Sequence, residues 1–306
     1  MIVMKRVVIF AHYDIQNIID DYVVFYLKAL KETADEIVFV SCCESLDTSK
    51  IDNIVSKSIV EKHNEYDFGS YKRGYLYLKD KLNEFDELIF ANDSCYGPFY
   101  PIKNVFDKMV QKDCDFWGIT KNNFGYAKNP LKFFVKRPHI QSYFICFRKN
   151  VFESKIFDNF IQSITSQKSK KEIISKYEIG LNELLSKNGY KYAVFINAFE
   201  NINNSAILKW RQLIKNYKMP FLKCSVPRLL NREMTTAEDW ENIVPDNYLI
   251  EIIKNNIKRL NLGIKNEKSY SLKTKQEFFD FISDKPFFIR KIITKIVFVI
   301  FPNLKD

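Results

Sequence analysis

A carboxylate follows a strand-like apolar segment at Asp93. The segment Glu87–Asn92 (ELIFAN) has the composition of a buried strand, and Asp93 and Ser94 come directly after it, shortly before Gly97-Pro98. In an open α/β sheet, ligands bind at the carboxyl ends of the strands. The carboxylate and the neighbouring amide and hydroxyl oxygens suit Mg²⁺ or Mn²⁺, which would keep positions for water and phosphate oxygens. Alternatively, Asp93 caps the backbone of the following turn.

A second polar segment, His63–Tyr75 (HNEYDFGSYKRGY), reads as a loop that leads into a helix. The amino end of such a helix can bind a phosphate, and Lys72 or Arg73 would add positive charge. The alternative is an ordinary surface helix that has Asp67 as its capping residue.

A third segment, His139–Phe144 (HIQSYF), brings polar and aromatic side chains to the start of a predicted strand. These residues form a polar and aromatic patch that could belong to a functional site. The alternative is a strand start whose polar groups are satisfied within the protein.

The elements that must position these residues alternate between strands and helices. Strands are predicted at Val7–Ala11, Glu36–Ser41, Glu87–Asn92, Asp115–Ile119, His139–Phe147 and Tyr192–Phe195. Helices are predicted at Ile15–Glu32, Ser49–Lys62 (weakly), Gly69–Asn83, Pro101–Lys112, Val151–Ser166 and Lys170–Lys187. This alternation predicts an α/β fold with a mostly parallel sheet whose two faces are covered.

Composition narrows the classes of function. The 306 residues are 46% apolar, which is enough for a sizeable core, and the eight glycines form no Gly-rich phosphate loop. The six cysteines form no C-x-x-C pair, so we expect buried thiols in a reducing cytosol instead of a zinc site. The net charge of +10 allows nucleic acid, an anionic membrane or a phosphorylated substrate as partner, or no specific partner at all.

The carboxyl-terminal part of the chain changes character from about Pro220, where helices without strands are expected. Within Pro286–Leu304 a helical wheel separates two arcs. The basic arc holds Arg290, Lys291, Thr294 and Lys295, and the other arc holds Ile289, Ile292, Ile293, Ile296, Val297, Val299 and Ile300. This pattern predicts a helix that lies in the surface of an anionic membrane, with docking on the protein as the alternative. No apolar run is long enough to span a membrane, and the amino-terminal segment reads as a strand and not as a signal peptide.

Six motifs occur in an order that resembles a known family. They are HYD (His12–Asp14), HNEYDFGSYKRG (from His63), DELIFANDSCYGPFYP (Asp86–Pro101), CDFWGIT (Cys114–Thr120), HIQSYF (from His139) and YEIGL (Tyr177–Leu181). Together they resemble the rhamnan-synthesis F family, rhamnosyltransferases of bacterial surface-polysaccharide assembly. The resemblance covers roughly residues 5–225 and includes Ile207–Lys223.

The resemblance implies a GT-A-like, Rossmann-type catalytic domain over residues 1–215 and a helical region over 216–306. It implies a nucleotide-sugar donor such as dTDP-β-L-rhamnose and a glycan or lipid-linked acceptor, and no nucleic acid. The wider GT-A class usually holds its metal with D-x-D, whereas this chain has Asn92-Asp93-Ser94. Asp93 is then the remaining ligand for Mg²⁺ or Mn²⁺, and activity without a metal stays open.

The resemblance also assigns expected roles to residues. Donor-binding residues are His12, Asp14, Asn64, Asp67, Gly69, Lys72, Asn92, Asp93 and Ser94. Acceptor-binding residues are Trp117, His139, Gln141, Ser142 and Tyr143, with core packing as the alternative for the aromatic ones. An α-linked product from a β-linked donor requires inversion, which needs a general base. Glu178, expected just before a helix, is the candidate, and Asp115 is its rival.

The expected function is therefore a cytoplasmic glycosyltransferase, peripheral on the inner face of the cell membrane, that transfers a deoxyhexose to a surface polysaccharide or lipid-linked glycan. The alternative is a protein without catalysis that binds carbohydrate or nucleic acid through its basic and aromatic residues. That alternative predicts basic residues gathered on one face and no need for Asp93.

Overall fold

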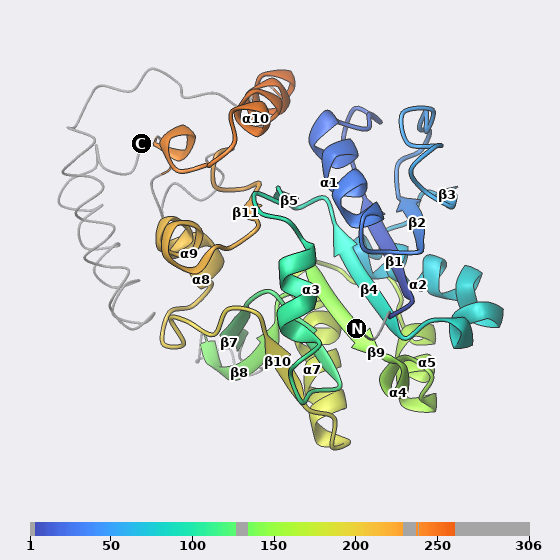
Figure 1. The fold of residues 1–306 in the computed structure, drawn as a ribbon. Helices are drawn as coiled ribbons and strands as arrows, with labels where there is room; N and C mark the ends of the chain where they lie inside the picture. The colour runs from blue at the N-terminus through green and yellow to red at the C-terminus, as the bar shows by residue number, and fades with distance from the viewer. Residues whose placement is uncertain (1–3, 127–133, 229–236, 238, 261–306) are drawn as a thin grey trace. The chain divides into compact units, whose positions relative to one another are not determined.

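The structure is a computed structural model that describes residues 4–126, 134–228, 237 and 239–260 (Figure 1). The chain forms two compact units. The first consists of Met1–Asp93 and Tyr100–Asn197, and the second of Ser94–Phe99 and Ala198–Asp306. Sequence reasoning placed a single boundary near residue 215.

The first unit is built on a seven-stranded sheet with the order β10-β6-β9-β4-β1-β2-β3. Its strands are β1 (Arg6–His12), β2 (Glu36–Ser41), β3 (Lys57–Val60), β4 (Glu87–Asn92), β6 (Phe116–Gly118), β9 (Phe144–Arg148) and β10 (Tyr192–Val194). Strand β9 runs antiparallel to both of its neighbours, whereas the other pairs are parallel. The predicted α/β fold with a mostly parallel sheet is confirmed.

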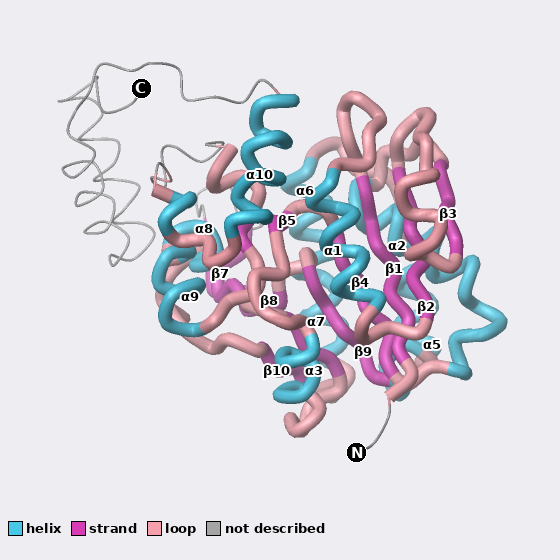
Figure 2. The backbone as a smooth tube through the Cα atoms, turned by 45° about the horizontal axis from the view of Figure 1, so that its top comes forward, coloured by secondary structure: helices cyan, strands magenta, loops and turns pink. Residues whose placement is uncertain are grey.

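Helices cover both faces of this sheet (Figures 1 and 2). They are α1 (Asp21–Lys31), α2 (Tyr66–Leu78), a 3-10 helix (Lys79–Glu84), α3 (Lys103–Met109), α4 (Lys149–Phe152), α5 (Lys155–Gln162), α6 (Lys170–Ile173), a π-helical turn (Ile174–Glu178) and α7 (Ile179–Lys187). On one face, Phe10 of β1 meets Tyr26 of α1, and Phe144 of β9 meets Phe106 of α3. The opposite face packs on α2, α5 and α7.

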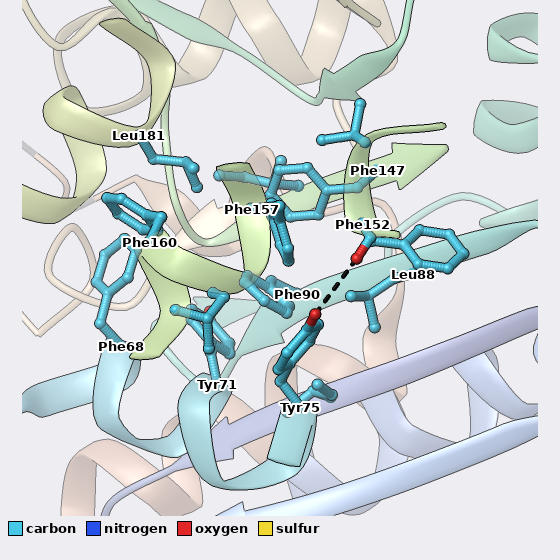
Figure 3. Packing of buried hydrophobic residues seen from close by; sticks show 14 of the residues in the cluster. Phe68, Tyr71, Tyr75, Leu88, Phe90, Phe147, Phe152, Phe157, Phe160 and Leu181 are labelled. Atoms are coloured by element: carbon cyan, nitrogen blue, oxygen red, sulfur yellow. Dashed lines mark hydrogen bonds between the residues drawn. The ribbon is translucent and has the colours of Figure 1, made fainter. Parts of the chain in front are cut away.

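An aromatic cluster fixes α2 against the sheet (Figure 3). The ring of Tyr71 stacks on Phe90 of β4 with centroids 4.3 Å apart, and Phe147 meets Phe157 of α5 at 4.8 Å. A Cβ atom at Gly74 would lie 2.4 Å from a methyl carbon of Ile9, so glycine permits the close approach of α2 to β1. Rings packed this tightly hold the amino-terminal end of α2 in place.

Two parts of the first unit differ from the sequence prediction. The weak helix predicted over Ser49–Lys62 is wrong, because Lys57–Val60 forms the edge strand β3 beside β2. The single strand predicted over His139–Phe147 contains the end of strand β8, a turn and most of strand β9. Strand β7 (Lys121–Tyr126) pairs with β8 (Phe134–Ile140) in a separate hairpin, and β9 begins only at Phe144. The residues between β8 and β9 therefore form a turn.

The second unit joins a two-stranded sheet of β5 (Cys95–Tyr96) and β11 (Leu222–Lys223) to short helices. These are α8 (Ser205–Leu208), α9 (Trp210–Tyr217), a 3-10 helix (Trp240–Asn242) and α10 (Asn247–Arg259). The buried Asn256 of α10 accepts hydrogen bonds from Tyr96 Oη at 2.5 Å and from Arg228. The predicted membrane-surface helix at 286–304 lies outside the described residues. None of the helices in the described ranges combines the length and apolarity needed to cross a membrane.

Candidate active site

One edge of the large sheet gathers segments that are far apart in the sequence. The carboxyl ends of β1, β2, β4 and β6 lie along this edge. Because β9 is antiparallel, its amino end lies on the same edge, and the turn at 141–143 comes with it. Two polar groups form here, one around Asp93 and one around Glu178.

The first group consists of Asp67, Asn92 and Asp93. Leu88 and Phe90 of β4 face the cluster that includes α2, and alternation along the strand turns Asn92 to the same side. There Asn92 Nδ2 donates to Asp67 Oδ2 at 2.8 Å. The carboxylate of Asp93 accepts the backbone N–H of Tyr13 at 2.9 Å. Asp93 thereby joins the end of β4 to the loop after β1.

The negative charge of this group contributes to a raised pKa of the nearby Cys42 thiol. Burial, followed by the charges of Asp67 and Asp93, raises the pKa of Cys42 to about 12. Cys42 follows β2 directly, so both carboxylates act on a residue at the same edge of the sheet. The electrostatic potential here favours a cation, or a ligand that brings one.

Tyr71 links the first group to the second. Its hydroxyl donates to the carbonyl oxygen of Ser142 at 3.1 Å. Burial and the charge of Asp67 raise the pKa of Tyr71 well above its usual value, while a hydrogen bond with the Asn92 side chain acts in the opposite direction. The phenol therefore stays neutral and can act as a donor between β4 and the turn before β9.

The second group surrounds Glu178. The Ser142 hydroxyl donates to Glu178 Oε2, and the Ser142 backbone N–H also points to Oε2 at 3.3 Å. Nε2 of His139 lies 3.3 Å from Glu178 Oε1. The carboxylate is 16% exposed, whereas the imidazole is only 2% exposed. Glu178 is thus a half-buried carboxylate whose two oxygens are held by neighbours.

The local structure at Glu178 differs from the expected helix start. Residues 170–187 form one helical stretch, and Glu178 ends a π-helical turn inside it. Such turns are frequent at functional sites because they place a side chain where a regular helix would not. Asn182, one turn later, accepts the Ile140 N–H at 3.0 Å and donates to the Glu178 carbonyl at 3.0 Å. The hairpin end and the helix are therefore clamped together.

The structure separates Asp115 from this edge. Asp115 precedes β6, so it lies at the amino-terminal edge of the sheet, opposite Glu178. Its carboxylate accepts Asn150 Nδ2 at 2.6 Å and the Lys191 N–H at 2.7 Å, which joins β6 to β10. Asp115, expected as the rival of Glu178, is therefore not among the polar residues at the carboxyl-terminal edge of the sheet.

The expected acceptor residues divide into two sets. Trp117 is fully buried against Phe106 of α3, so the alternative of core packing applies to it. Thr120 donates to Gln141 Oε1 at 2.8 Å and lies 2.7 Å from Tyr143 Oη, so these two polar residues are tied to the end of β6. His139 and Ser142 instead contact Glu178.

Three residues on or near α2 were expected to bind the donor, but in the structure they contact other parts of the protein or are exposed. The ammonium of Lys72 donates to the carbonyls of Gln162 and Ile164 at 2.9 Å each, at the end of α5, on a different side of the helix from Asp67. A Cβ atom at Gly69 would lie 2.6 Å from the His63 ring, so this glycine serves close packing. Asn64 is exposed in the turn before α2.

The remaining expected donor residues also have identified contacts. His12 is buried, with Nδ1 3.0 Å from Ser41 Oγ. Asp14 accepts backbone N–H groups of Gln16 at 2.9 Å and Ile18 at 3.3 Å, and so shapes the loop after β1. Ser94 belongs to the second unit, where Lys223 Nζ lies 3.3 Å from its hydroxyl.

Few side chains near Asp93 could act as ligands for a metal ion. Within the described part of the chain, no three His, Cys, Asp or Glu side chains are grouped so that they could hold a metal ion. The oxygens of Asp67, Asn92 and Asp93 are hard ligands, and Mg²⁺ commonly takes only one or two carboxylates when waters and phosphate oxygens complete its shell. The residues therefore fit a cation that arrives with a phosphate-bearing substrate.

Tyr71 and Tyr13 are site residues that sequence reasoning missed. Tyr71 follows Asp67 by four residues, a spacing that places both on one face of a helix and was visible in the sequence. The contact between Tyr13 N–H and Asp93 depends on the pairing of β1 with β4, and no local pattern shows it.

The fold and the site define an α/β protein with an acidic group and a tethered glutamate at the carboxyl edge of its sheet. Residues 37–293 match the model of the family described as Rhamnan synthesis protein F. The chain belongs to that family, as its motifs predicted.

Similarity to individual proteins is partial. The virulence protein VirA of Vibrio anguillarum is 31% identical over 142 residues, which is 44% of this chain and 41% of VirA. The uncharacterized protein y4gN of Sinorhizobium fredii is 28% identical over 151 residues, which is 47% of this chain and 38% of y4gN. The chain thus spans less than half the length of these curated relatives. The crystal structure of 4-diphosphocytidyl-2C-methyl-D-erythritol synthase matches 69% of this chain and 99% of its own, with 11% identity and a TM-score of 0.41.

Proposed function

We propose that this chain is an inverting glycosyltransferase that moves a deoxyhexose, rhamnose foremost, from a nucleotide sugar to a growing surface polysaccharide or lipid-linked glycan. The observation that supports this most is the continuous set of hydrogen bonds from Asp67 through Asn92, Tyr71 and Ser142 to Glu178. These hydrogen bonds connect an acidic group to a separate carboxylate at the carboxyl edge of the sheet, where α/β proteins commonly bind ligands. Membership of a rhamnan-synthesis family supports the sugar and the product class.

The acidic group would hold the diphosphate end of the donor. Asp67 and Asp93 would bind Mg²⁺ or Mn²⁺, which neutralises the charge of the departing diphosphate when it is bound. Asn92 keeps Asp67 in place, and the Tyr13 N–H keeps Asp93 in place. Positions held in this way need little rearrangement when the substrate arrives.

Glu178 would take the proton of the acceptor hydroxyl. Inversion requires the hydroxyl to attack the anomeric carbon from the side opposite the leaving diphosphate. Glu178 reaches this edge from the helical stretch at 170–187, whereas the acidic group lies on β4 and α2. The two groups are thus carried by different elements, an arrangement that is compatible with attack from the opposite side.

The test is Glu178→Gln, which keeps the shape of the side chain but cannot accept a proton. We expect turnover of dTDP-rhamnose to fall by about 10²- to 10⁴-fold, the usual cost of losing a positioned base. The affinity for the donor, measured by calorimetry, should not change.

Two outcomes would contradict this proposal. Wild-type turnover in Glu178→Gln would remove Glu178 as the base, and lost donor affinity would place it in the donor pocket. A non-catalytic binding protein predicts no turnover at all, together with thermal stabilisation by glycans and none by nucleotide sugars. A panel of nucleotides, nucleotide sugars and glycans, with and without Mg²⁺, separates the two functions.

A further inference from the structure

Donors from the β8–β9 connection converge on the carboxylate of Glu178. Ser142 offers its hydroxyl and its backbone N–H to Oε2, and the His139 ring faces Oε1 with Nε2 at 3.3 Å. Sequence reasoning expected both residues to contact the acceptor. In the structure both residues contact the Glu178 side chain, so they can act on the reaction through Glu178.

The hydrogen bonds of His139 determine where its protons lie. Nδ1 is 2.8 Å from the carbonyl oxygen of Arg137, which can only accept, so Nδ1 carries a proton. Nε2 faces an oxygen of Glu178 that also accepts when the carboxylate is ionised. Two acceptors would repel each other at this distance, so a proton must lie between them. With the proton on Nε2 the ring is an imidazolium, and with the proton on Glu178 Oε1 the ring stays neutral.

Charged side chains next to the pair have partners of their own. The guanidinium of Arg137 is bound by both oxygens of Glu183, at 2.6 and 2.7 Å, and it also contacts Ser175 Oγ at 3.1 Å. Lys176 lies over the ring of Tyr177 at 5.2 Å. Arg137 and Glu183 therefore neutralise each other, and they fix the backbone carbonyl that orients the His139 ring.

We propose that His139 is a positioning residue that donates its Nε2 proton to Glu178, so that His139 and Ser142 hold the carboxylate ionised and in one orientation. This inference rests on the proposed role of Glu178 as the base. A base held by donors on both oxygens loses little conformational freedom when the acceptor hydroxyl arrives. A base without these donors would sample several rotamers and several directions of approach.

A spectroscopic test does not depend on turnover. The chain has three histidines, so ¹⁵N-histidine labelling of the full chain gives three imidazoles, and the loss of signals in His139→Gln assigns that of His139. We expect protons on both nitrogens of His139 in the wild type and loss of the Nε2 proton in Glu178→Gln. His63, which faces Glu65 at 3.1 Å, serves as the internal reference and should not change. An Nε2 without a proton in the wild type would overturn the proposal.

A kinetic test separates positioning from acceptor binding. His139→Ala should lower kcat by about 10²-fold, the scale of a misplaced catalytic group, with the KM values of both substrates unchanged. His139→Gln retains an N–H donor and should recover part of that loss, which also controls for a folding defect in the alanine variant. A raised acceptor KM with unchanged kcat would overturn the proposal. If the wild-type chain transfers no sugar, the proposed function is wrong. The spectroscopic test alone then decides whether His139 positions Glu178.

Discussion

Asp93 and Asp115 are both aspartates beside a buried strand, yet they lie at opposite edges of the same sheet. Asp93 follows β4 and Asp115 precedes β6, and these two strands point in the same direction. The order of carboxylate and strand along the chain therefore decides which edge the side chain reaches. Only the carboxyl-terminal edge gathers the other polar residues of the candidate site.

Asp93→Asn tests this distinction because it removes the charge and keeps an oxygen for the Tyr13 N–H. We expect turnover to fall by at least about 10²-fold, since a cation held at this position contributes several kcal/mol of charge stabilisation. EDTA should inhibit the wild type strongly and have little further effect on the variant.

Asp115→Asn is the matched control. It should keep wild-type turnover and lose about 1 kcal/mol of unfolding free energy, because one of the two hydrogen bonds of the carboxylate cannot be made by the amide. Equal loss of turnover in the two variants would contradict the assignment of the site to one edge.

Helix α2 contacts two different elements with two of its sides. Asp67 and Tyr71 point to the end of β4, whereas Lys72 points to the end of α5. Lys72→Met should therefore lower the unfolding free energy by about 1 to 3 kcal/mol through two lost charge-assisted hydrogen bonds. Urea unfolding measures this loss. Donor affinity, measured on the same sample, should stay at the wild-type value, and a weaker affinity would return Lys72 to the donor site.

Tyr71→Phe removes a hydroxyl and keeps the ring that stacks on Phe90. The Ser142 carbonyl loses a buried donor, which should cost about 1 to 3 kcal/mol in unfolding free energy. We also expect a lower kcat, because Ser142 holds Glu178. Leu76→Ala, an exposed position on the same helix, serves as the control for both measurements. A stability loss without any change in kcat would show that the two polar groups are not coupled.

Hydrophobic periodicity predicted the central elements well and the edges poorly. Glu36–Ser41 and Glu87–Asn92 were predicted with the bounds that the structure shows, because continuous apolar runs mark strands covered on both faces. The short edge strand β3 has two exposed residues and little pattern. The turn between β8 and β9 was hidden because its residues are buried, like Ile140 before it and Phe144 after it.

The candidate site was predictable residue by residue only where local sequence determines placement. The Asn92-Asp93 pair at a strand end was chosen in this way, whereas Glu178 was chosen from the family resemblance, as a carboxylate just before a helix. The contact of His139 and Ser142 with Glu178 depends on an antiparallel strand and a π-helical turn, which no sequence period shows. The assignment of these residues to the acceptor came from the family resemblance and did not include their contact with Glu178.

The net charge of +10 and the segment at 286–304 are the features of the whole chain that predict attachment to a membrane surface. That segment lies outside the described residues. The basic arc includes Arg290, Lys291 and Lys295, and each such residue near an anionic surface contributes about 1 kcal/mol. The isoleucines and valines of the opposite arc would enter the boundary between headgroups and acyl chains. A chain that acts on lipid-linked glycans would gain local substrate concentration from this attachment.

Removal of residues from Pro286 onward should shift the protein from the membrane fraction to the supernatant. Flotation with vesicles of 30% anionic lipid (about one anionic lipid in three, a charge density that attracts basic segments) measures this directly, and neutral vesicles should bind less of the full chain. Lys291→Gln with Lys295→Gln is the sharper variant, since it keeps the apolar arc and weakens only the charge. We expect it to lose the difference between anionic and neutral vesicles. Unchanged flotation of the truncated chain would contradict membrane attachment through this segment and favour a helix that packs on the protein, in which case truncation should lower the unfolding free energy instead.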